Sequence, residues 1–455
     1  MLTYELKKMP GVPLYEALYR CIRADILDGN LKPGERLPSK RALASNLEVS
    51  KITVETAYSQ LLSEGYIRSR ERQGYFVESI HRPAPVPAER TAPVVPAREE
   101  PALDLTANGS ASFPFSVWSR LQRQVLLDFG EKLLLPLPNR GVPELRQAIA
   151  DHLAGFRGMT VDPGNILIGA GTDFLYNLLI QLLGRELCYA VEEPGYGKIR
   201  KIYAAGGVRC ISAPMDGRGV RPEGLREANV LHFSPSHHFP TGLVTPVQRR
   251  LELLNWAKET NSWIIEDDYD SEFRFDAHPM PAMQSLDSHR VIYMNSFSKT
   301  LAPSIRISYL VLPPELMGQF REALGFYSCT VASFEQYTLA RFLSRGHFEK
   351  HINRMRKFYR NRRNRVVELL EGSDFADKIT ILEQDAGLHF LVKVDTPLSD
   401  ADLAEKLLSA GIRVKPLSSY YHLPVGEDRH CFLVNYSVLD EAALEAALKR
   451  LPEHL

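Results

Sequence analysis

The pattern of apolar and polar positions at the start of the chain predicts three helices followed by a hairpin. The first helix is expected where apolar residues recur at helical spacing, at Leu14, Leu18, Ile22 and Ile26. Ser39 and Ser50 are suited to cap two further helices, over residues 40–46 and 51–64. Polar and apolar residues then alternate across residues 66–77, around a Gln-Gly turn, as in a two-stranded hairpin. This succession predicts a winged helix-turn-helix domain.

In such a domain, which we assign to residues 1–80, DNA would meet the wing and the start of the second helix of the turn. Lys51 and Thr53 are placed to reach base edges there. The wing residues suited to phosphates or to the minor groove are Arg70, Arg72 and Gly74. The segment is only weakly basic overall, so a small helical protein-interaction domain stays open as the alternative on pattern alone.

Beyond this domain the pattern changes twice. Residues 81–102 are dense in proline and have no apolar period, which predicts an extended, semi-stiff linker. Over residues 103–455, short apolar runs lead into polar clusters, as strands do at the crevice of an α/β sheet. Such strands are expected over Val291–Met294 and from Trp263 into a cluster of acids. Residues 345–455 indicate a smaller α+β subdomain.

Lys299 follows the first of these strands. A lysine just past a buried strand loses solvation, which lowers the pKa of its amine and leaves it able to hold an aldehyde as a Schiff base. Ser296, Ser298 and Arg306 surround it in sequence and suit a phosphate dianion beside that aldehyde. A surface lysine after a strand is the alternative that this stretch alone leaves open.

Asp267 stands at the end of the second strand. A buried carboxylate there would hold a pyridine nitrogen protonated and make the ring an electron sink. For one aspartate by itself a solvated acidic turn is the simpler interpretation. Lys299 and Arg306 alongside it favour pyridoxal phosphate as the cofactor.

A second phosphate clamp is expected where a strand, a glycine turn and a helix follow one another. Gly171 lets the backbone approach a ligand, and the helix start at Thr172 and Asp173 offers free N–H groups. Asp173 would serve through its backbone, because its side chain carries the wrong charge for a phosphate.

Composition excludes several classes of protein. The 455 residues have a net charge of zero, 44% hydrophobic and 24% charged residues, which is ordinary for a globular protein. The five cysteines are scattered and odd in number, which argues for a reducing compartment and against a zinc site. No apolar run approaches about 20 residues and no signal peptide opens the chain, so a cytoplasmic protein without a membrane segment is expected.

The first domain resembles the GntR-type DNA-binding domain over nearly its whole length, from Leu31-x-Pro-Gly-x-x-Leu-Pro-Ser39 to Glu64-Gly65-Tyr66. This resemblance implies that Ser39, Arg41, Lys51, Thr53 and Gly74 face DNA. Lys51 replaces the usual arginine, and an ammonium cannot form a planar fork to guanine. The Gln-Gly-Tyr sequence at residues 73–75 also differs from the usual wing tip, so the operator sequence stays open.

From about Leu103 onward the chain resembles the fold type I aminotransferases. The resemblance implies that Asp267 pairs with the pyridine nitrogen, Tyr269 contacts the ring oxygen and Tyr196 stacks on the ring. Two positions depart from that family. Phe239 precedes Pro240 where an asparagine usually bonds the ring oxygen, and the neighbouring His238 is a candidate to replace it. Leu433 stands where an arginine usually grips the substrate carboxylate.

Taken whole, the chain resembles the MocR-type subgroup, which fuses a GntR head to an aminotransferase-like body. This resemblance implies a transcription regulator that is a head-to-tail homodimer on a double-stranded DNA operator. It would sense pyridoxal phosphate, or an amine or amino-acid effector, through the Schiff base at Lys299. Two alternatives stay open: an aminotransferase with a DNA-binding head, and a body that has lost its cofactor and only dimerises. Retention of Lys299, Asp267 and Arg306 disfavours the latter.

Overall fold

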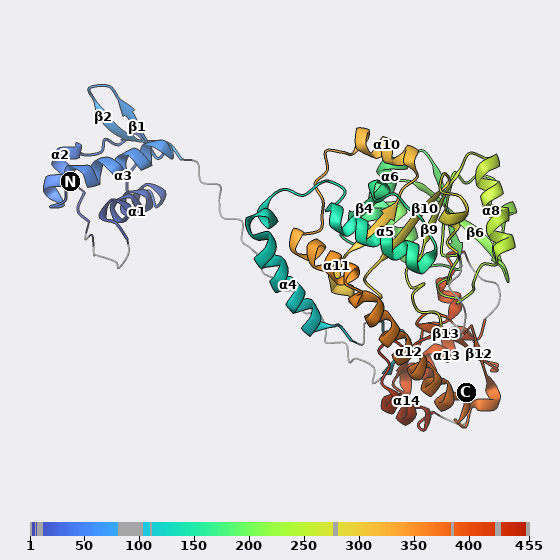
Figure 1. Cartoon of the computed structure of the whole chain (residues 1–455). Coiled ribbons are helices and arrows are strands. Elements are labelled where there is room, and N and C mark those ends of the chain that lie inside the picture. Colours follow the sequence, from blue (N-terminus) through green and yellow to red (C-terminus); the bar gives the residue numbers. More distant parts are fainter. Residues whose placement is uncertain are drawn as a thin grey trace. The chain divides into compact units, whose positions relative to one another are not determined.

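The computed structural model divides the chain into two compact units, Met1–Arg98 and Glu99–Leu455, each described by itself below (Figure 1). The residues that the structure describes are 2–4, 6, 12–80, 103–109, 112–275, 281–383, 386–423 and 429–451. The expected linker lies outside these residues. No helix within them is long and apolar enough to cross a membrane.

The first unit contains the three helices and the hairpin that the sequence predicts. Its elements are α1 (Leu14–Leu27), α2 (Lys40–Asn46), α3 (Lys51–Ser63), β1 (Ile67–Arg70) and β2 (Gly74–Val77). The two expected caps form, because Ser39 Oγ accepts a hydrogen bond from Ala42 N and Ser50 Oγ accepts one from Thr53 N. The hairpin turn falls one residue earlier than expected, since Gly74 already pairs with Arg70.

The second unit is built on an eight-stranded sheet in the order β4-β11-β10-β9-β8-β5-β6-β7. These strands are β4 (Ile166–Gly169), β5 (Cys188–Glu193), β6 (Arg209–Asp216), β7 (Gly219–Val220), β8 (Val230–Phe233), β9 (Trp263–Asp267), β10 (Val291–Ser296) and β11 (Ser308–Val311). β8, β9 and β10 run parallel, whereas β11 is antiparallel to both of its neighbours. Both expected strands are thus present as β9 and β10. Because neighbouring parallel strands end at the same edge, Asp267 and the turn after Ser296 come together.

Helices cover both faces of this sheet (Figure 1). The helices of this part of the chain are α4 (Phe115–Phe129), which packs against α11, and α5 (Pro143–Arg157), α6 (Thr172–Leu183), α7 (Gly197–Ala205), α8 (Val247–Glu259), α9 (Met283–Leu286), α10 (Pro314–Ala323) and α11 (Ser333–Ser344). Successive strand residues enter different cores: Tyr309 and Val311 pack with α5 and α11, and Leu310 with α6 and α10. Strands buried on both sides explain the continuous apolar runs in the sequence.

A smaller subdomain follows the long helix α12 (His347–Glu371). Its other elements are β12 (Ile379–Leu382), β13 (His389–Val394), α13 (Asp400–Ser409), β14 (Ile412–Arg413), β15 (Cys431–Asn435) and α14 (Glu441–Leu448). β12, β13 and β15 form a three-stranded sheet, and β14 pairs with β3 (Leu103–Asp104). The strand expected from Gly387 begins two residues later, because Gly387 has a φ of 73° and its N–H donates to Phe273 O.

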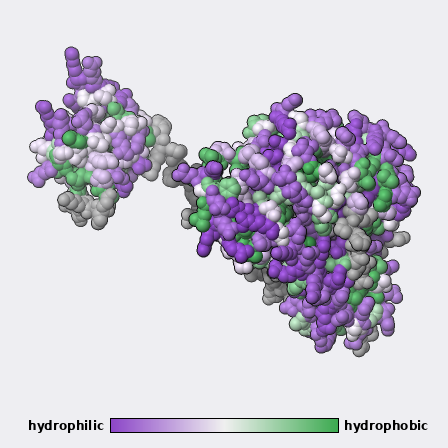
Figure 2. All heavy atoms as spheres, in the orientation of Figure 1, coloured by the Kyte–Doolittle hydropathy of each residue, from purple (hydrophilic) through white to green (hydrophobic). Residues whose placement is uncertain are grey.

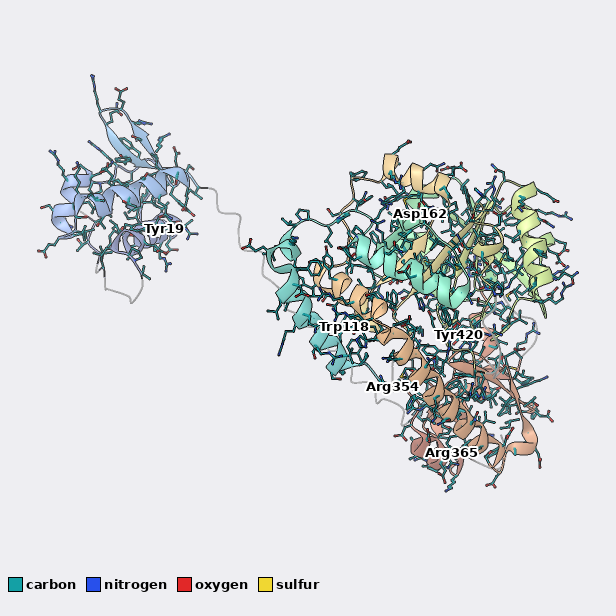
Figure 3. All side chains as sticks on the ribbon, viewed as in Figure 1. Tyr19, Trp118, Asp162, Arg354, Arg365 and Tyr420 are labelled. Carbon is teal, nitrogen blue, oxygen red and sulfur yellow. The ribbon has the colours of Figure 1, made fainter. Side chains whose placement is uncertain are left out.

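The helix α12 joins this subdomain to the segment that follows the acids of β9. Arg356 Nε donates to the carbonyl of Glu272 at 2.6 Å, and the Arg360 guanidinium donates to the carbonyl of Phe275. Figure 3 labels Arg354 and Arg365, which project from the same helix. Among the basic residues of α12, Arg356 and Arg360 therefore have a structural role, because each donates a hydrogen bond to a backbone carbonyl.

Candidate functional site

Lys299 lies in the turn after β10, next to the end of β9. The register pairs Met294 of β10 with Asp267, so the lysine and the acid meet at one edge of the sheet. The Lys299 side chain is half-buried. Burial lowers the pKa of its amine, and the nearby Asp270 carboxylate partly opposes that shift. An amine with a lowered pKa is the nucleophile that the sequence predicts here.

Asp267 is buried, and its two carboxylate oxygens differ. Oδ2 accepts a hydrogen bond from the Tyr176 hydroxyl at 2.7 Å and lies 3.3 Å from Nε2 of His232. Oδ1 is buried without a hydrogen-bond partner among the described residues. Leaving a buried carboxylate oxygen unpaired is costly, so it is suited to receive a donor such as a protonated ring nitrogen.

Three side chains behind Asp267 were missed by sequence reasoning. The Tyr203 hydroxyl lies 2.6 Å from Nδ1 of His232, so His232 bridges a tyrosine on α7 and the carboxylate. Tyr176 comes from α6, far away in the sequence. The available signal was a histidine inside the apolar strand β8, where a buried imidazole needs polar partners on both nitrogens.

Gly171, Asp173 and Arg306 lie together in the part of the site that is expected to bind the phosphate group. Gly171 precedes α6 with a φ of 88°, and a Cβ atom added there would run into the Arg306 guanidinium. Arg306 Nη2 lies 3.5 Å from Asp173, whose carboxylate also pairs with Lys198 at 2.7 Å. The acid that would repel a phosphate is therefore neutralised by two cations, and the N–H groups at Thr172 stay at the start of the helix.

The serines of this end lie beside each other. The Ser296 hydroxyl donates to Ser298 Oγ at 2.9 Å, and Ser296 Oγ accepts from the Ser298 N–H. Small hydroxyl groups in this position can donate to an anion without filling the space that it needs.

The residues expected to contact the cofactor ring are Tyr269 and Tyr196, and the structure adds His237 beside them. Tyr269 is half-buried, and its hydroxyl lies 3.2 Å from His237 Nδ1, which also contacts Asp270 at 2.9 Å. Nε2 of His237 is buried and has no partner in the described part of the chain. Tyr196 is 49% exposed and meets Phe239 edge-on, with ring centroids 5.7 Å apart. A flat group at this edge would therefore find both a tyrosine face and a free histidine nitrogen.

The candidate His238 does not fit the role at the ring oxygen. Its Nδ1 contacts Thr241 Oγ1 at 2.7 Å and its Nε2 contacts Pro194 O at 3.0 Å. Burial lowers the pKa of its imidazole to about 3. With both nitrogens occupied, His238 holds the loop together, and the geometry favours His237 for the ring oxygen instead.

In the first unit, the expected DNA-facing side chains lie on the exposed surface. Arg41, Lys51, Arg70 and Arg72 are exposed and form no ion pair within the described residues. Hydroxyls of Ser39, Ser50 and Thr53 serve the helix caps. Lys40 differs, because its ammonium pairs with Glu55 at 2.7 Å. Of the four unpaired cations named above, two lie in the first turns of α2 and α3 and two on the wing.

Comparison with known proteins assigns each of the two units to a family. Residues 101–451 match the family of class I and II aminotransferases, and residues 14–77 match the gntR family of bacterial regulatory proteins. The chain is 38% identical to the uncharacterized HTH-type transcriptional regulator YdeL of Bacillus subtilis, with 93% of each chain covered. It is 33% identical to the probable rhizopine catabolism regulatory protein MocR of Rhizobium meliloti, covering 98% of this chain and 94% of that one.

Among solved structures, the multiple substrate aminotransferase of Thermococcus profundus is similar in fold. The TM-score is 0.68 at 24% identity, over 77% of this chain and 90% of that one. Fold and site together define a DNA-binding regulator whose body is an aminotransferase-like, pyridoxal phosphate-dependent domain. The chain belongs to the MocR-type subgroup of the GntR family of transcription regulators.

Replacing Gly171 with alanine is expected to lower the affinity for pyridoxal phosphate at least tenfold. The new Cβ would displace the Arg306 guanidinium, and the positive φ would add strain of about 1–3 kcal/mol. Titration of cofactor-free protein, followed by absorbance, measures the effect. Gly155→Ala, within α5 and with open space around its Cβ position, is the matched control and should bind normally. If Gly171→Ala bound pyridoxal phosphate with unchanged affinity, this turn would not be part of the cofactor site.

Proposed function

We propose that the protein regulates transcription by coupling occupancy of the Lys299 site to the DNA binding of its head. The observation that carries this proposal is that one edge of the sheet holds both a half-buried lysine and a buried aspartate, one oxygen of which has no partner among the described residues. A regulator that only dimerised would have no use for either group. The domains that we propose for the two tasks are residues 1–80 and 103–455, joined by the linker 81–102.

Each side chain of the site has a distinct proposed task. Bound pyridoxal phosphate supplies an aldehyde that reacts reversibly with primary amines, and Lys299 is the resident amine. Asp267 Oδ1 would accept the ring N–H, while Tyr176 and His232 hold this carboxylate in place. The residues proposed to hold the remaining parts of the cofactor are Tyr269, His237 and Tyr196 at the ring, and Ser296, Ser298, Arg306, Gly171, Thr172 and Asp173 at the phosphate.

The test compares DNA binding of the full chain with and without its cofactor. DNA from upstream of its own gene is the first probe, and cofactor is removed with hydroxylamine and then restored. A change of at least tenfold in the apparent Kd, reversed on restoration, supports the proposal. The same affinity in both states, with the cofactor spectrum present in one and absent in the other, would contradict it. Cytoplasmic location follows from such a role.

We propose further that the protein is a homodimer, arranged head-to-tail as the family resemblance implies. Apolar side chains are exposed around the end of α4 and the 3-10 turn η1 (Gly130–Leu134), where Figure 2 shows hydrophobic spheres together. Leu127 is 77% exposed, Leu134 76% and Leu135 63%. A monomer seldom exposes apolar side chains so close together, so a second copy of the chain is the proposed cover.

Changing both Leu127 and Leu135 to glutamate is expected to weaken the dimer at least a hundredfold. Each leucine contributes about 1.5–3 kcal/mol when fully buried, and a buried carboxylate adds a penalty. Sedimentation equilibrium measures the dissociation constant. Leu251→Glu, at an exposed apolar position on α8, is the control and should leave association unchanged. If the double variant dimerised as strongly as the wild type, the interface would have to lie on another surface.

Replacing Lys51 with alanine is expected to weaken operator binding about tenfold, because a side chain at the start of α3 would lose its contact with a base edge. If Lys51 also contacts phosphate, the dependence of log Kd on log salt should fall by about one. Fluorescence anisotropy at several salt concentrations measures both. Arg20→Ala on α1 removes one exposed positive charge and is the control. Equal losses in the two variants would mean that α3 has no special role.

A further inference from the structure

The helix α3 begins with an exposed isoleucine. Ile52 is the second residue of α3, directly after Lys51, and its exposed fraction is 74%. The N–H of Thr53 donates to the hydroxyl of Ser50, so the first turn that carries Ile52 is capped. The residues that α3 buries in the core of the head are Val54, Ala57, Tyr58 and Leu61. Ile52 therefore belongs to the side of the helix that this core leaves open.

The rest of this side of α3 is polar. The residues three, four and seven positions after Ile52 share its face of the helix, and they are Glu55, Thr56 and Ser59, all exposed. The acid is not an uncompensated charge, because the ammonium of Lys40 lies 2.7 Å from the Glu55 carboxylate. The Thr56 hydroxyl donates to the carbonyl of Ile52 at 2.9 Å. This face thus presents an apolar side chain in its first turn and polar side chains in the turns that follow.

A single exposed apolar residue is ordinary on a protein surface, so the position of Ile52 matters more than its exposure. In a helix-turn-helix domain, the first residues of the second helix of the turn reach base edges in the major groove. Residues 14–77 match the gntR family of regulatory proteins, and α3 is that second helix. Lys51 beside Ile52, and Arg41 in the first turn of α2, are exposed cations that suit the phosphates bordering a groove.

The major groove offers one apolar group that such a side chain can meet. Thymine carries a methyl group at C5 there, whereas the other bases are read mainly through hydrogen-bond donors and acceptors. Isoleucine can satisfy none of these polar groups, so packing it on them would remove their water without replacing it. Packing on a thymine methyl removes two apolar groups from water and is favourable.

We propose that Ile52 packs on the methyl group of a thymine in the major groove and thereby selects thymine at one position of the operator. The proposal concerns the DNA-binding head and does not depend on coupling to Lys299. All measurements therefore use the full chain with pyridoxal phosphate present throughout. If DNA binding proved insensitive to the cofactor, the proposed coupling would fail while the selection of thymine could still be measured.

The first test uses DNA from upstream of the protein's own gene and the same fragment made with deoxyuridine in place of thymidine. This exchange removes the methyl groups and keeps the base pairing. The wild type is expected to bind the uracil fragment about fourfold more weakly, which is the effect of one buried methyl-sized group. Ile52→Ala, with a good helix former at an exposed position, should bind the thymine fragment several-fold more weakly than the wild type and should not distinguish the two fragments.

Leu62→Ala is the matched control. Leu62 is also exposed and apolar, but it lies in the last turn of α3, ten residues or about 15 Å along the helix from Ile52. This variant should distinguish the two fragments as the wild type does. If Ile52→Ala kept the full discrimination, other groups or the shape of the DNA would be reading the methyl, and the proposal would be overturned.

Selection from random duplexes is a second measurement that needs no known operator. The wild type should enrich sequences that share a thymine at one position. Ile52→Ala should accept other bases at that position and keep the rest of the selected sequence. The same preference for thymine in both proteins, or wild-type sequences that share no thymine, would overturn the proposal. If the wild type enriched no sequence at all, the head would read no base, and the proposal would fail with that result.

Discussion

Replacing Lys299 with alanine is expected to abolish the covalently bound cofactor spectrum and the response of DNA binding to amines. This amine has the lowered pKa and lies in the turn after β10, the strand whose Met294 pairs with Asp267 of β9. Affinity for pyridoxal phosphate should fall at least a hundredfold, because the covalent bond is lost while the phosphate and ring contacts stay. Absorbance of purified protein and a titration of DNA binding measure both effects.

Two controls accompany this variant. Lys449→Ala removes an exposed lysine just after α14 and should behave as wild type. Lys299→Arg keeps a positive charge but cannot form the bond, so it should match Lys299→Ala in the spectrum. Retention of a cofactor band and of the amine response in Lys299→Ala would place the reactive amine elsewhere and end the proposed coupling.

Replacing Asp268 with alanine is expected to lower the free energy of unfolding of the body by about 3–5 kcal/mol, which is the usual cost of breaking a buried ion pair. Asp268 Oδ2 lies 3.0 Å from Arg157 Nη2 and accepts the Tyr293 hydroxyl at 2.6 Å, with both members of the ion pair almost fully buried. Burial opposes the charge of Arg157, but Asp268 and neighbouring acids raise its pKa above the usual value. The variant would leave that guanidinium buried without its main counter-ion.

Thermal melting of the full chain measures this loss, which should lower the Tm by about 6 °C or more. Glu227→Ala breaks the exposed pair with Arg209 and should cost about 1 kcal/mol or less. Replacing both buried partners, as Arg157→Met with Asp268→Leu, should recover much of the stability. A Tm of Asp268→Ala equal to that of Glu227→Ala would show that the pair is not a structural anchor of β9.

The parts of the site that sequence could predict are those with a local signal. Lys299 and Asp267 each follow an apolar run, and the run itself gives the strand, the burial and the sheet edge. Gly171 is similar, since a glycine between a strand and a helix signals a positive φ. The caps at Ser39 and Ser50 formed as predicted because a cap needs only its own first turn.

The parts that sequence could not predict depend on contacts between distant segments. Tyr176 reaches Asp267 across 91 residues, and nothing near either residue signals the other. The different contacts of His237 and His238 depend on how one loop packs against Asp270 and Pro194. Sequence also gives no sign that Glu55 neutralises Lys40 in the head, because the two lie on different helices.

The length of helix α12 and its attachment to the large domain affect how movements at the site reach the small subdomain. Its 25 residues form a rod about 37 Å long, which Arg356 and Arg360 tie near its middle to the carbonyls that follow the acids of β9. A tilt of about 5° at that attachment displaces the far end of the helix, about 17–22 Å away, by about 2 Å. Sub-ångström adjustments around Asp267 are thereby amplified with distance, so the outer sheet and α14 would travel farther than the atoms that start the movement.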